Sequence, residues 1–224
     1  MMESVIFPAF PTLIQKFKFE GDNEHLQNVV LGISKFENVD PHLSGYSFLE
    51  RYKDSYKIID EFLTFSQKCA ETFFADTLRY KREKMVCVNS WVNTLRSLDD
   101  YLPPHFHTNS FVSSNYFLSY KHGKHAPLVF LNSDRSSPIP CLVHDKEDQN
   151  GDTAILEYSE GDLVFWKSEL THFVPKSSEL GRVTIAQNYM PEVINTGGYS
   201  FKSAPVNNST KHFLDGLLDG TEKN

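Results

Sequence analysis

Residues 104–120 read PHFHTNSFVSSNYFLSY, and this stretch decides how the rest of the chain is interpreted. Its second part, Ser110–Tyr120, is rich in β-branched and aromatic residues and predicts a β-strand. His105 and His107 are two residues apart, so both imidazoles point to the same side of an extended segment. With a third imidazole such as His172, which lies 65 residues beyond His107, they predict a metal site. Imidazole suits iron, zinc and copper rather than calcium or magnesium.

Strand-like segments fill the chain beyond residue 85. They are short, rich in β-branched and aromatic residues, and separated by proline, glycine, asparagine and serine. They are Met85–Val92, Ser110–Tyr120, Pro127–Asn132, Thr153–Tyr158, Asp162–Trp166 and Arg182–Tyr189. Six or more strands spaced in this way predict a sandwich, a barrel or a jelly roll.

Helical spacing of apolar residues dominates the chain before residue 85. One run is Leu26, Val29, Val30, Ile33 and Phe36, and a longer one is Ile58, Phe62, Phe65, Cys69 and Phe73. The aromatic members of the longer run, together with Phe74, predict a helix packed on the outside of the sheet. The expected fold is therefore mainly β with N-terminal helices.

We expect one structural domain with three parts. Residues 1–84 form an N-terminal strand and helical support region, residues 85–192 form the core, and residues 193–224 form a tail. Residues 133–152 are polar and predict a long loop of functional or mobile type. The tail holds a short amphipathic stretch over residues 213–218, which is open to interpretation as a lid, a dimer contact or a frayed end.

Composition limits the classes of function. The 224 residues carry a net charge of -7 without a basic stripe, which argues against sequence-independent nucleic-acid binding. Cys69, Cys87 and Cys141 are widely spaced and lack a Cys-x-x-Cys pair, as expected of reduced thiols. No segment approaches eighteen apolar residues, and the start of the chain has no signal-peptide pattern. We expect a soluble, cytoplasmic protein with no membrane partner.

Several short motifs carry a family resemblance over roughly residues 89–190. They are Asn89-Ser90-Trp91, His105–Ser110, Ser113–Leu118, Gly161–Trp166, His172–Pro175 and Arg182–Ile185. Together they resemble the 2-oxoglutarate and iron(II)-dependent oxygenases, in particular the small members common in bacteria and marine phages. The signature of those proteins is Trp, His-x-His-Pro-Asn-Ser, Ser-Gly-x-Tyr-Tyr, Gly-Asp-x-x-x-Phe, His-x-Val and Arg. The opening Phe7–Pro11 is also similar to their short N-terminal strand.

The resemblance implies a double-stranded β-helix, or jelly roll, with iron(II) at its open end. His105, His107 and His172 would be the metal ligands and catalytic residues. Arg182 would bind the far carboxylate of 2-oxoglutarate, while Thr184 and Tyr116 would add hydroxyl contacts. Dioxygen would be the second co-substrate, and ascorbate is allowed as a reductant. The implied reaction is hydroxylation of an unactivated C–H bond, coupled to decarboxylation of 2-oxoglutarate to succinate.

The substrate is open at this stage. A peptidyl residue such as proline is one alternative, and a free amino acid or another small metabolite is the other. A homodimer is also allowed.

The motifs depart from the family pattern at the metal. Most of the superfamily has His-x-Asp or His-x-Glu at the first site, which supplies a carboxylate to the iron. Here the second position is His107, so a set of three histidines is neutral. The alternative places His107 as the first ligand and Asn109 at the second position, and an amide is a poor metal ligand. We prefer His105 with His107. The family's Ser-Gly is Ser113-Ser114 here, and its second tyrosine is Phe117.

Other polar and aromatic residues have simpler interpretations. Trp91 and Trp166 are expected to fill the core rather than to contact substrate. Asp99-Asp100 precedes the histidines and is expected in a turn or a helix cap rather than on the metal. The remaining histidines lie in polar loops and are expected to face solvent; these are His122, His125 and His144.

Two rival functions remain from the residues alone. A cupin-type metalloprotein shares the jelly roll and a His-x-His start, but it would need a glutamate shortly after His107, where Thr108–Phe111 offer none. A non-catalytic jelly-roll binding protein is the second rival, and the missing carboxylate is the feature that favours it.

Overall fold

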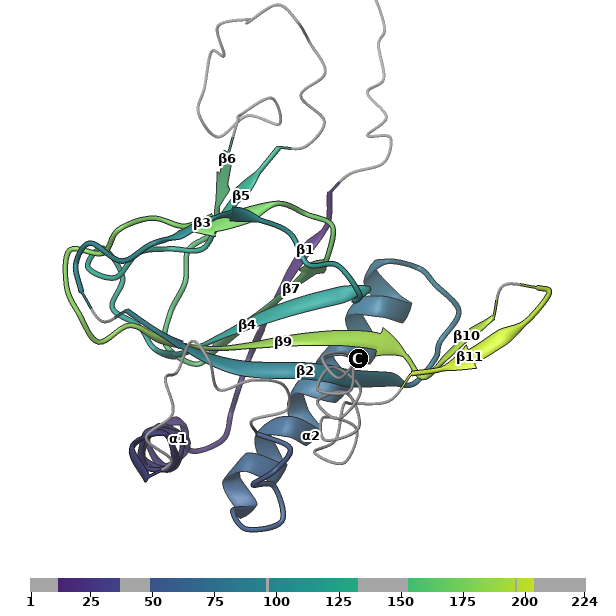
Figure 1. The fold of residues 1–224 in the computed structure, drawn as a ribbon, viewed down its shortest axis with the longest axis horizontal. Helices are drawn as coiled ribbons and strands as arrows, with labels where there is room; N and C mark the ends of the chain where they lie inside the picture. Colours follow the sequence, from purple (N-terminus) through teal and green to yellow (C-terminus); the bar gives the residue numbers. More distant parts are fainter. Residues whose placement is uncertain (1–11, 37–48, 96, 133–152, 196, 204–224) are drawn as a thin grey trace, which may run out of the picture.

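The computed structural model describes residues 12–36, 49–95, 97–132, 153–195 and 197–203. Two antiparallel sheets face each other (Figure 1). The larger sheet has the order β1-β7-β4-β9-β2, with β1 at Ile14–Lys18, β7 at Asp162–Lys167, β4 at Val112–Ser119, β9 at Val183–Pro191 and β2 at Met85–Thr94. The smaller has the order β3-β8-β5-β6, with β3 at Leu102–His105, β8 at His172–Val174, β5 at Val129–Leu131 and β6 at Thr153–Ile155. This is the double-stranded β-helix that the sequence predicts.

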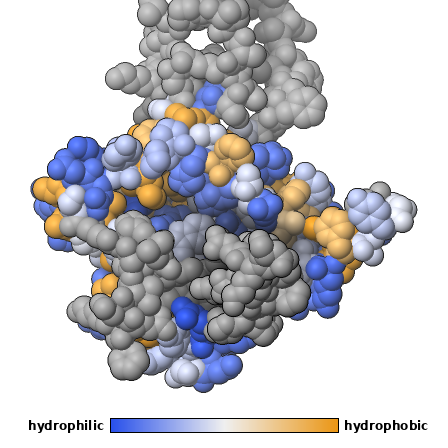
Figure 2. Space-filling model, in the orientation of Figure 1, coloured by the Kyte–Doolittle hydropathy of each residue, from blue (hydrophilic) through white to orange (hydrophobic). Residues whose placement is uncertain are grey.

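Each of the six strand-like segments of the sequence overlaps a strand of the structure. β3, which ends at His105, is part of the extended segment expected around the two histidines, whereas the short strands β1 and β8 were not expected at their positions. A two-stranded hairpin of β10 (Val193–Asn195) and β11 (Ser200–Lys202) was also not expected, and it projects from the body beside the end of β9 (Figure 1). The hairpin carries exposed apolar side chains, among them Val193 and Phe201. Figure 2 shows hydrophobic surface on the part of the molecule from which the hairpin projects.

The larger sheet is buried on both faces, and alternate residues of each strand divide between two environments. On β4, Tyr116 belongs to the core beneath the helices, whereas Phe117 belongs to the core between the two sheets. On β7, Phe165 and Trp166 divide in the same way. The interior face of β4 and β9 also carries polar residues, and the site described below is built from them.

Two helices cover the outer face of the larger sheet: α1 (Asn23–Phe36) and α2 (Lys57–Thr72) (Figure 1). A π-helical turn over Phe73–Thr77 continues α2. The side of α2 that faces the sheet is apolar, and Phe62 is fully buried there with ring contacts to Phe19 and Tyr116. The sequence interpretation of this aromatic run as packing is therefore confirmed.

Several sequence expectations fall outside the described residues. They are the Phe7–Pro11 strand, the 133–152 loop with Cys141 and His144, and the amphipathic stretch of the tail. Within the described ranges, no helix is long and apolar enough to cross a membrane.

Phe62→Ala tests the packing of α2 on the sheet. Because Phe62 is 0% exposed, we expect the free energy of unfolding to fall by about 3–5 kcal/mol in urea denaturation. Ile155→Ala is the control, since Ile155 is 60% exposed and its truncation should change stability by no more than about 0.5 kcal/mol. Equal effects of the two substitutions would contradict the assigned core.

Candidate metal centre

The three histidines predicted to bind a metal meet where β3 ends and β8 begins in the smaller sheet. His105 ends β3, His172 begins β8, and the two are directly opposite each other in the antiparallel register. His107 lies just beyond β3, where its backbone N–H donates to the carbonyl of Ser168 at 2.9 Å. Each imidazole offers one nitrogen, and these three atoms lie within 4.8 Å of one another. That separation allows all three to bind one ion.

Hydrogen bonds at Nδ1 orient each ring. The Nδ1 atom of His105 lies 2.8 Å from the carbonyl of Pro103, and that of His172 lies 2.9 Å from the carbonyl of Leu170. The Nδ1 atom of His107 lies 2.7 Å from Oδ1 of Asn188. A carbonyl oxygen only accepts, so these contacts place the proton on Nδ1 and leave Nε2 as the metal-binding nitrogen.

Burial keeps two of the rings neutral. Burial is the main cause that lowers the pKa of His172 to about 3, and repulsion from His105 and His107 is a smaller contribution to the same shift. Burial also lowers the pKa of His107, although the hydrogen bond to Asn188 raises it in part. A neutral imidazole is the form that binds a metal, so the site need not lose these protons at neutral pH.

Arg182 carries a positive charge in a buried position. It is 1% exposed, yet no carboxylate in the described part of the chain pairs with it. Its Nε donates to the carbonyl of Ala126 at 2.9 Å, its Nη1 donates to Thr184 Oγ1 at 3.4 Å, and it lies over the ring of Phe117 at 5.7 Å. Burial lowers the pKa of Arg182 to about 10. A buried cation without a counter-charge is costly, so the site is suited to an anionic ligand.

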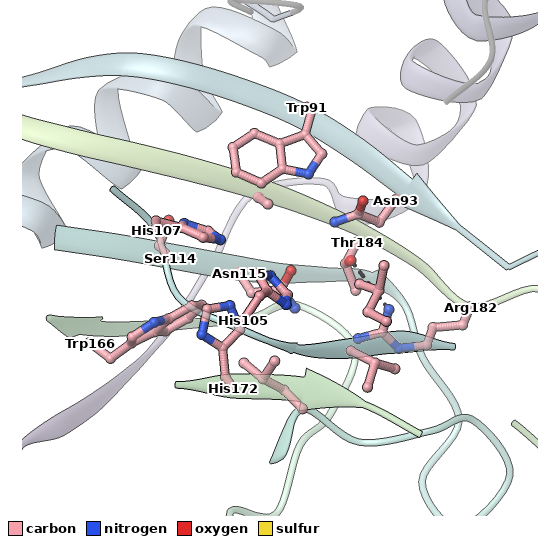
Figure 3. Close-up of a pocket in the computed structure, with 14 residues that line it drawn as sticks. Trp91, Asn93, His105, His107, Ser114, Asn115, Trp166, His172, Arg182 and Thr184 are labelled. Atoms are coloured by element: carbon pink, nitrogen blue, oxygen red, sulfur yellow. Dashed lines mark hydrogen bonds between the residues drawn. The ribbon is translucent and has the colours of Figure 1, made fainter. Parts of the chain in front are cut away.

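The histidines and Arg182 line one cavity of about 90 Å³ between the sheets (Figure 3). Three further donors on its wall have no partner among the described residues: the hydroxyl of Ser114 and Nδ2 of Asn115 on β4, and the indole N–H of Trp166 on β7. With the guanidinium, the wall therefore presents several hydrogen-bond donors and one positive charge. An acceptor-rich anion that also reaches the three Nε2 atoms fits this arrangement.

The residues of the cavity fit a divalent transition-metal ion. Three imidazoles held at the end of β3, just beyond β3 and at the start of β8 can occupy one side of an ion and leave its other coordination positions open. Among the described residues, no carboxylate joins the group of three histidines. Asp99 pairs with Lys176 and Asp100 accepts hydrogen bonds from Ser97 within a turn, as expected from the sequence.

The structure brings together five of the predicted site residues and separates two. His105, His107, His172, Arg182 and Thr184 all line the cavity.

Tyr116 and Asn109 lie away from the cavity. The ring of Tyr116 is on the helix-covered face of the sheet, where its hydroxyl donates to Asn23 Oδ1 at 2.6 Å, so it does not reach the co-substrate position. Asn109 is exposed, in a left-handed turn with φ of 61°, and does not line the cavity.

Two other expectations are corrected by position. Trp91 is half-buried and lines the cavity, with its ring centroid 5.5 Å from that of His107. Trp166 is a core residue, as expected, although its ring also lines the cavity, with its centroid 4.9 Å from that of His172. His125 is buried rather than solvent-facing: it accepts from the backbone N–H of Lys121 and contacts the carbonyl of Leu180.

Sequence reasoning missed the polar residues that support the site, namely Asn115, Asn188 and Ser113. Strand alternation offered a signal for them. Asn188 is an even number of residues beyond Thr184 on one strand, and Ser113 and Asn115 share a face of another.

Comparisons with known proteins point to a family of oxygenases. A family model described as "Putative 2OG-Fe(II) oxygenase" matches residues 89–188, which include all three histidines, Arg182 and Asn188. A comparison with curated proteins gives no match.

Solved structures with a similar fold come from several bacteria. HygX from Streptomyces hygroscopicus with nickel and 2-oxoglutarate bound is 11% identical, with 80% of this chain and 83% of HygX covered and a TM-score of 0.50. A Pseudomonas putida prolyl-4-hydroxylase is 12% identical, with 80% and 88% covered and a TM-score of 0.48. A 2OG-Fe(II) oxygenase family oxidoreductase from Burkholderia pseudomallei is 13% identical, with 53% of this chain and 50% of that chain covered and a TM-score of 0.39. The match thus spans only half the length of the Burkholderia protein.

These findings have different weight. The likeness to HygX shows a shared double-stranded β-helix. The family match supports the 2-oxoglutarate and iron(II)-dependent oxygenase superfamily, an oxidoreductase class whose cofactor is iron(II) and whose co-substrates are 2-oxoglutarate and dioxygen.

Metal titration of histidine variants tests the ligand set. We expect wild-type protein to bind one cobalt(II) or nickel(II) ion in isothermal titration calorimetry. Replacing any one ligand by alanine should weaken metal binding by more than about 100-fold in His105→Ala, His107→Ala and His172→Ala. Loss of a residue that only supports a ligand already costs about 10–100-fold, and loss of the ligand itself should cost more. His122 is exposed, so His122→Ala should bind as wild type does. A His172→Ala variant with unchanged affinity would rule out the three-histidine site.

Proposed function

We propose that this chain is an iron(II)- and 2-oxoglutarate-dependent oxygenase of the hydroxylase type. The observation that carries the proposal is a fully buried guanidinium that has no counter-ion among the described residues and shares one small cavity with three convergent imidazoles. A ligand that satisfies both must chelate a metal at one end and present a carboxylate at the other. 2-Oxoglutarate has both features.

His105, His107 and His172 would hold the iron through Nε2. The chemistry supplied by the bound iron(II) is the oxidation of a substrate C–H bond by dioxygen, coupled to decarboxylation of 2-oxoglutarate to succinate. The contribution of the protein is orientation. The rings are fixed at Nδ1 before any ion binds, so little order is lost when the ligands engage.

Arg182 would bind the far carboxylate of 2-oxoglutarate. Two of its N–H groups are used by Ala126 and Thr184, and the others remain for a bidentate pair with the ligand. The hydroxyl of Thr184, on the same strand face, and the amide of Asn115 offer further polar contacts in the same cavity. Because the guanidinium is buried, a carboxylate would relieve the cost of an unpaired charge rather than compete with water.

Trp91 and Asn93 of β2 would form the substrate side of the site. They line the cavity from the strand that ends the larger sheet, and the ring of Trp91 lies beside His107. Apart from the histidines and Arg182, the described wall holds no ionisable side chain. A peptidyl residue such as proline, or an uncharged part of a small metabolite, suits such a wall.

A non-catalytic jelly-roll binding protein is the second candidate, and the lack of a carboxylate among the three ligands favours it. Binding of metal and 2-oxoglutarate without product would mark that function.

Anaerobic titration with iron(II) and 2-oxoglutarate tests the proposal. We expect a visible metal-to-ligand charge-transfer band in the wild type and none in His172→Ala. Arg182→Met should weaken 2-oxoglutarate binding on the order of 100-fold, because loss of one partner of a buried charge pair costs about 2–5 kcal/mol. Arg82→Met is the matched control, since Arg82 is exposed and pairs with Asp76.

Three outcomes are informative. A band together with succinate formation in air supports the oxygenase. A band without succinate, even with candidate peptides and amino acids added, favours the binding protein. Absence of a band in the wild type would contradict both the co-substrate and the oxygenase assignment.

A further inference from the structure

One of the three histidines depends on side chains for its orientation, whereas the other two do not. The Nδ1 atoms of His105 and His172 each contact a backbone carbonyl two residues earlier in the chain, an arrangement that any residue at that position would supply. The Nδ1 atom of His107 contacts Oδ1 of Asn188 at 2.7 Å and Oγ of Ser113 at 2.9 Å. Asn188 is 81 residues away in the sequence and comes from the opposite sheet.

Asn188 occupies a fixed place. It lies on the interior face of β9, it is 7% exposed, and it pairs in register with Ser113 of β4 and with Asn89 of β2. The hydroxyl of Ser113 donates to the same Oδ1 atom at 2.8 Å. The backbone of Asn188 is therefore held by pairing with both neighbouring strands, and its amide oxygen is held by the hydroxyl of Ser113.

A short chain of hydroxyls fixes the direction of these hydrogen bonds. Ser110 donates to Ser168 at 2.9 Å, the hydroxyls of Ser168 and Ser113 are 2.8 Å apart, and Ser113 donates to Asn188. If each hydroxyl donates to the next, the chain ends with a proton directed at Oδ1 of Asn188. That direction favours the amide orientation with its oxygen, rather than its NH₂ group, toward His107.

The orientation of the amide decides whether His107 can bind a metal. With Oδ1 toward the ring, Nδ1 carries the proton and Nε2 has a free lone pair. With the NH₂ group toward the ring, Nδ1 would have to accept, and the proton would move to Nε2, where it blocks coordination. The orientation of the Asn188 amide therefore determines whether Nε2 of His107 can coordinate a metal.

We propose that Asn188 is a positioning residue that fixes the Nδ1–H tautomer of His107 and so makes His107 the third metal ligand. The inference rests on the proposed metal site. It assigns to the larger sheet a direct part in forming a centre whose ligands come from the smaller sheet and its adjoining segment.

Nuclear magnetic resonance of the metal-free protein tests the proposal without any metal. Long-range ¹H–¹⁵N correlation of the histidine rings should show His107 as the Nδ1–H tautomer in the wild type. In Asn188→Leu the Oδ1 acceptor is lost, and the Ser113 hydroxyl, which donates to Oδ1 in the wild type, is free to donate to Nδ1 of His107 instead. We therefore expect the Nε2–H tautomer of His107 to become populated. Asn188→Asp keeps an acceptor oxygen at this place and should retain the wild-type tautomer.

Metal affinity supplies the second readout. We expect Asn188→Leu to weaken cobalt(II) binding about 10- to 100-fold and to alter the visible d–d spectrum of the bound ion. Asn188→Asp should bind cobalt(II) within about threefold of the wild type or more tightly, because a carboxylate acceptor makes the imidazole a stronger donor.

Gln187→Leu is the matched control for packing. Gln187 is the adjacent buried amide on the same strand, but it faces the helices, where it donates to Ser66. It should lose stability as Asn188→Leu does, while the tautomer of His107 and the cobalt(II) affinity stay at wild-type values.

The outcomes separate this proposal from the proposed function. A wild type that binds no cobalt(II) would end the metal-site assignment, while the tautomer data would still test the role of Asn188. A wild type that binds metal while Asn188→Leu keeps both its tautomer and its affinity would overturn the positioning role alone. Equal effects of Gln187→Leu and Asn188→Leu on affinity would also overturn it.

Discussion

The pairing of β3 with β8 is the constraint on which the site depends. It sets His105 directly opposite His172 at one end of a short antiparallel ladder, and His107 follows at the point where the chain leaves β3. A shift of that register by one residue would turn one ring away from the cavity. The two prolines of β3 lie on an edge strand, where the loss of backbone donors is tolerated and the strand is kept short. The rest of the fold supports this ladder by facing it with the larger sheet.

The two faces of the larger sheet have different roles: one stabilises the fold and the other forms the site. The helix-covered face of the larger sheet is largely apolar and contains the aromatic contacts of α2. The opposite face carries a buried guanidinium and unpaired donors, which cost stability in the absence of a ligand. Such a cost is expected where residues are retained for function rather than for packing. Gly181, with φ of 98°, and the buried His125 hold the loop segments that precede Arg182 and supply its carbonyl partner.

Most of the fold and part of the site could be predicted from the sequence. Runs of β-branched and aromatic residues located the long strands, and the two-residue spacing of His105 and His107 placed both imidazoles in one cavity. Tyr116 was misplaced because β4 is buried on both faces, so its sequence does not alternate between polar and apolar residues and does not reveal which parity faces the site. Asn188 was missed because strand alternation places it on the same face as Thr184 but does not reveal its contact with His107 across 81 residues. His125 was misplaced because the residues just before it, 121–124, are polar and exposed, whereas its own ring is buried against the carbonyl of Leu180.

X-ray diffraction with anomalous scattering at the iron edge, on crystals grown without oxygen in the presence of iron(II) and 2-oxoglutarate, tests the central claim most directly. The account predicts one anomalous peak about 2.0–2.2 Å from Nε2 of His105, His107 and His172, with a carboxylate of 2-oxoglutarate paired to Arg182. A peak bound elsewhere, or bound to two of the histidines with the third ring turned away, would contradict it.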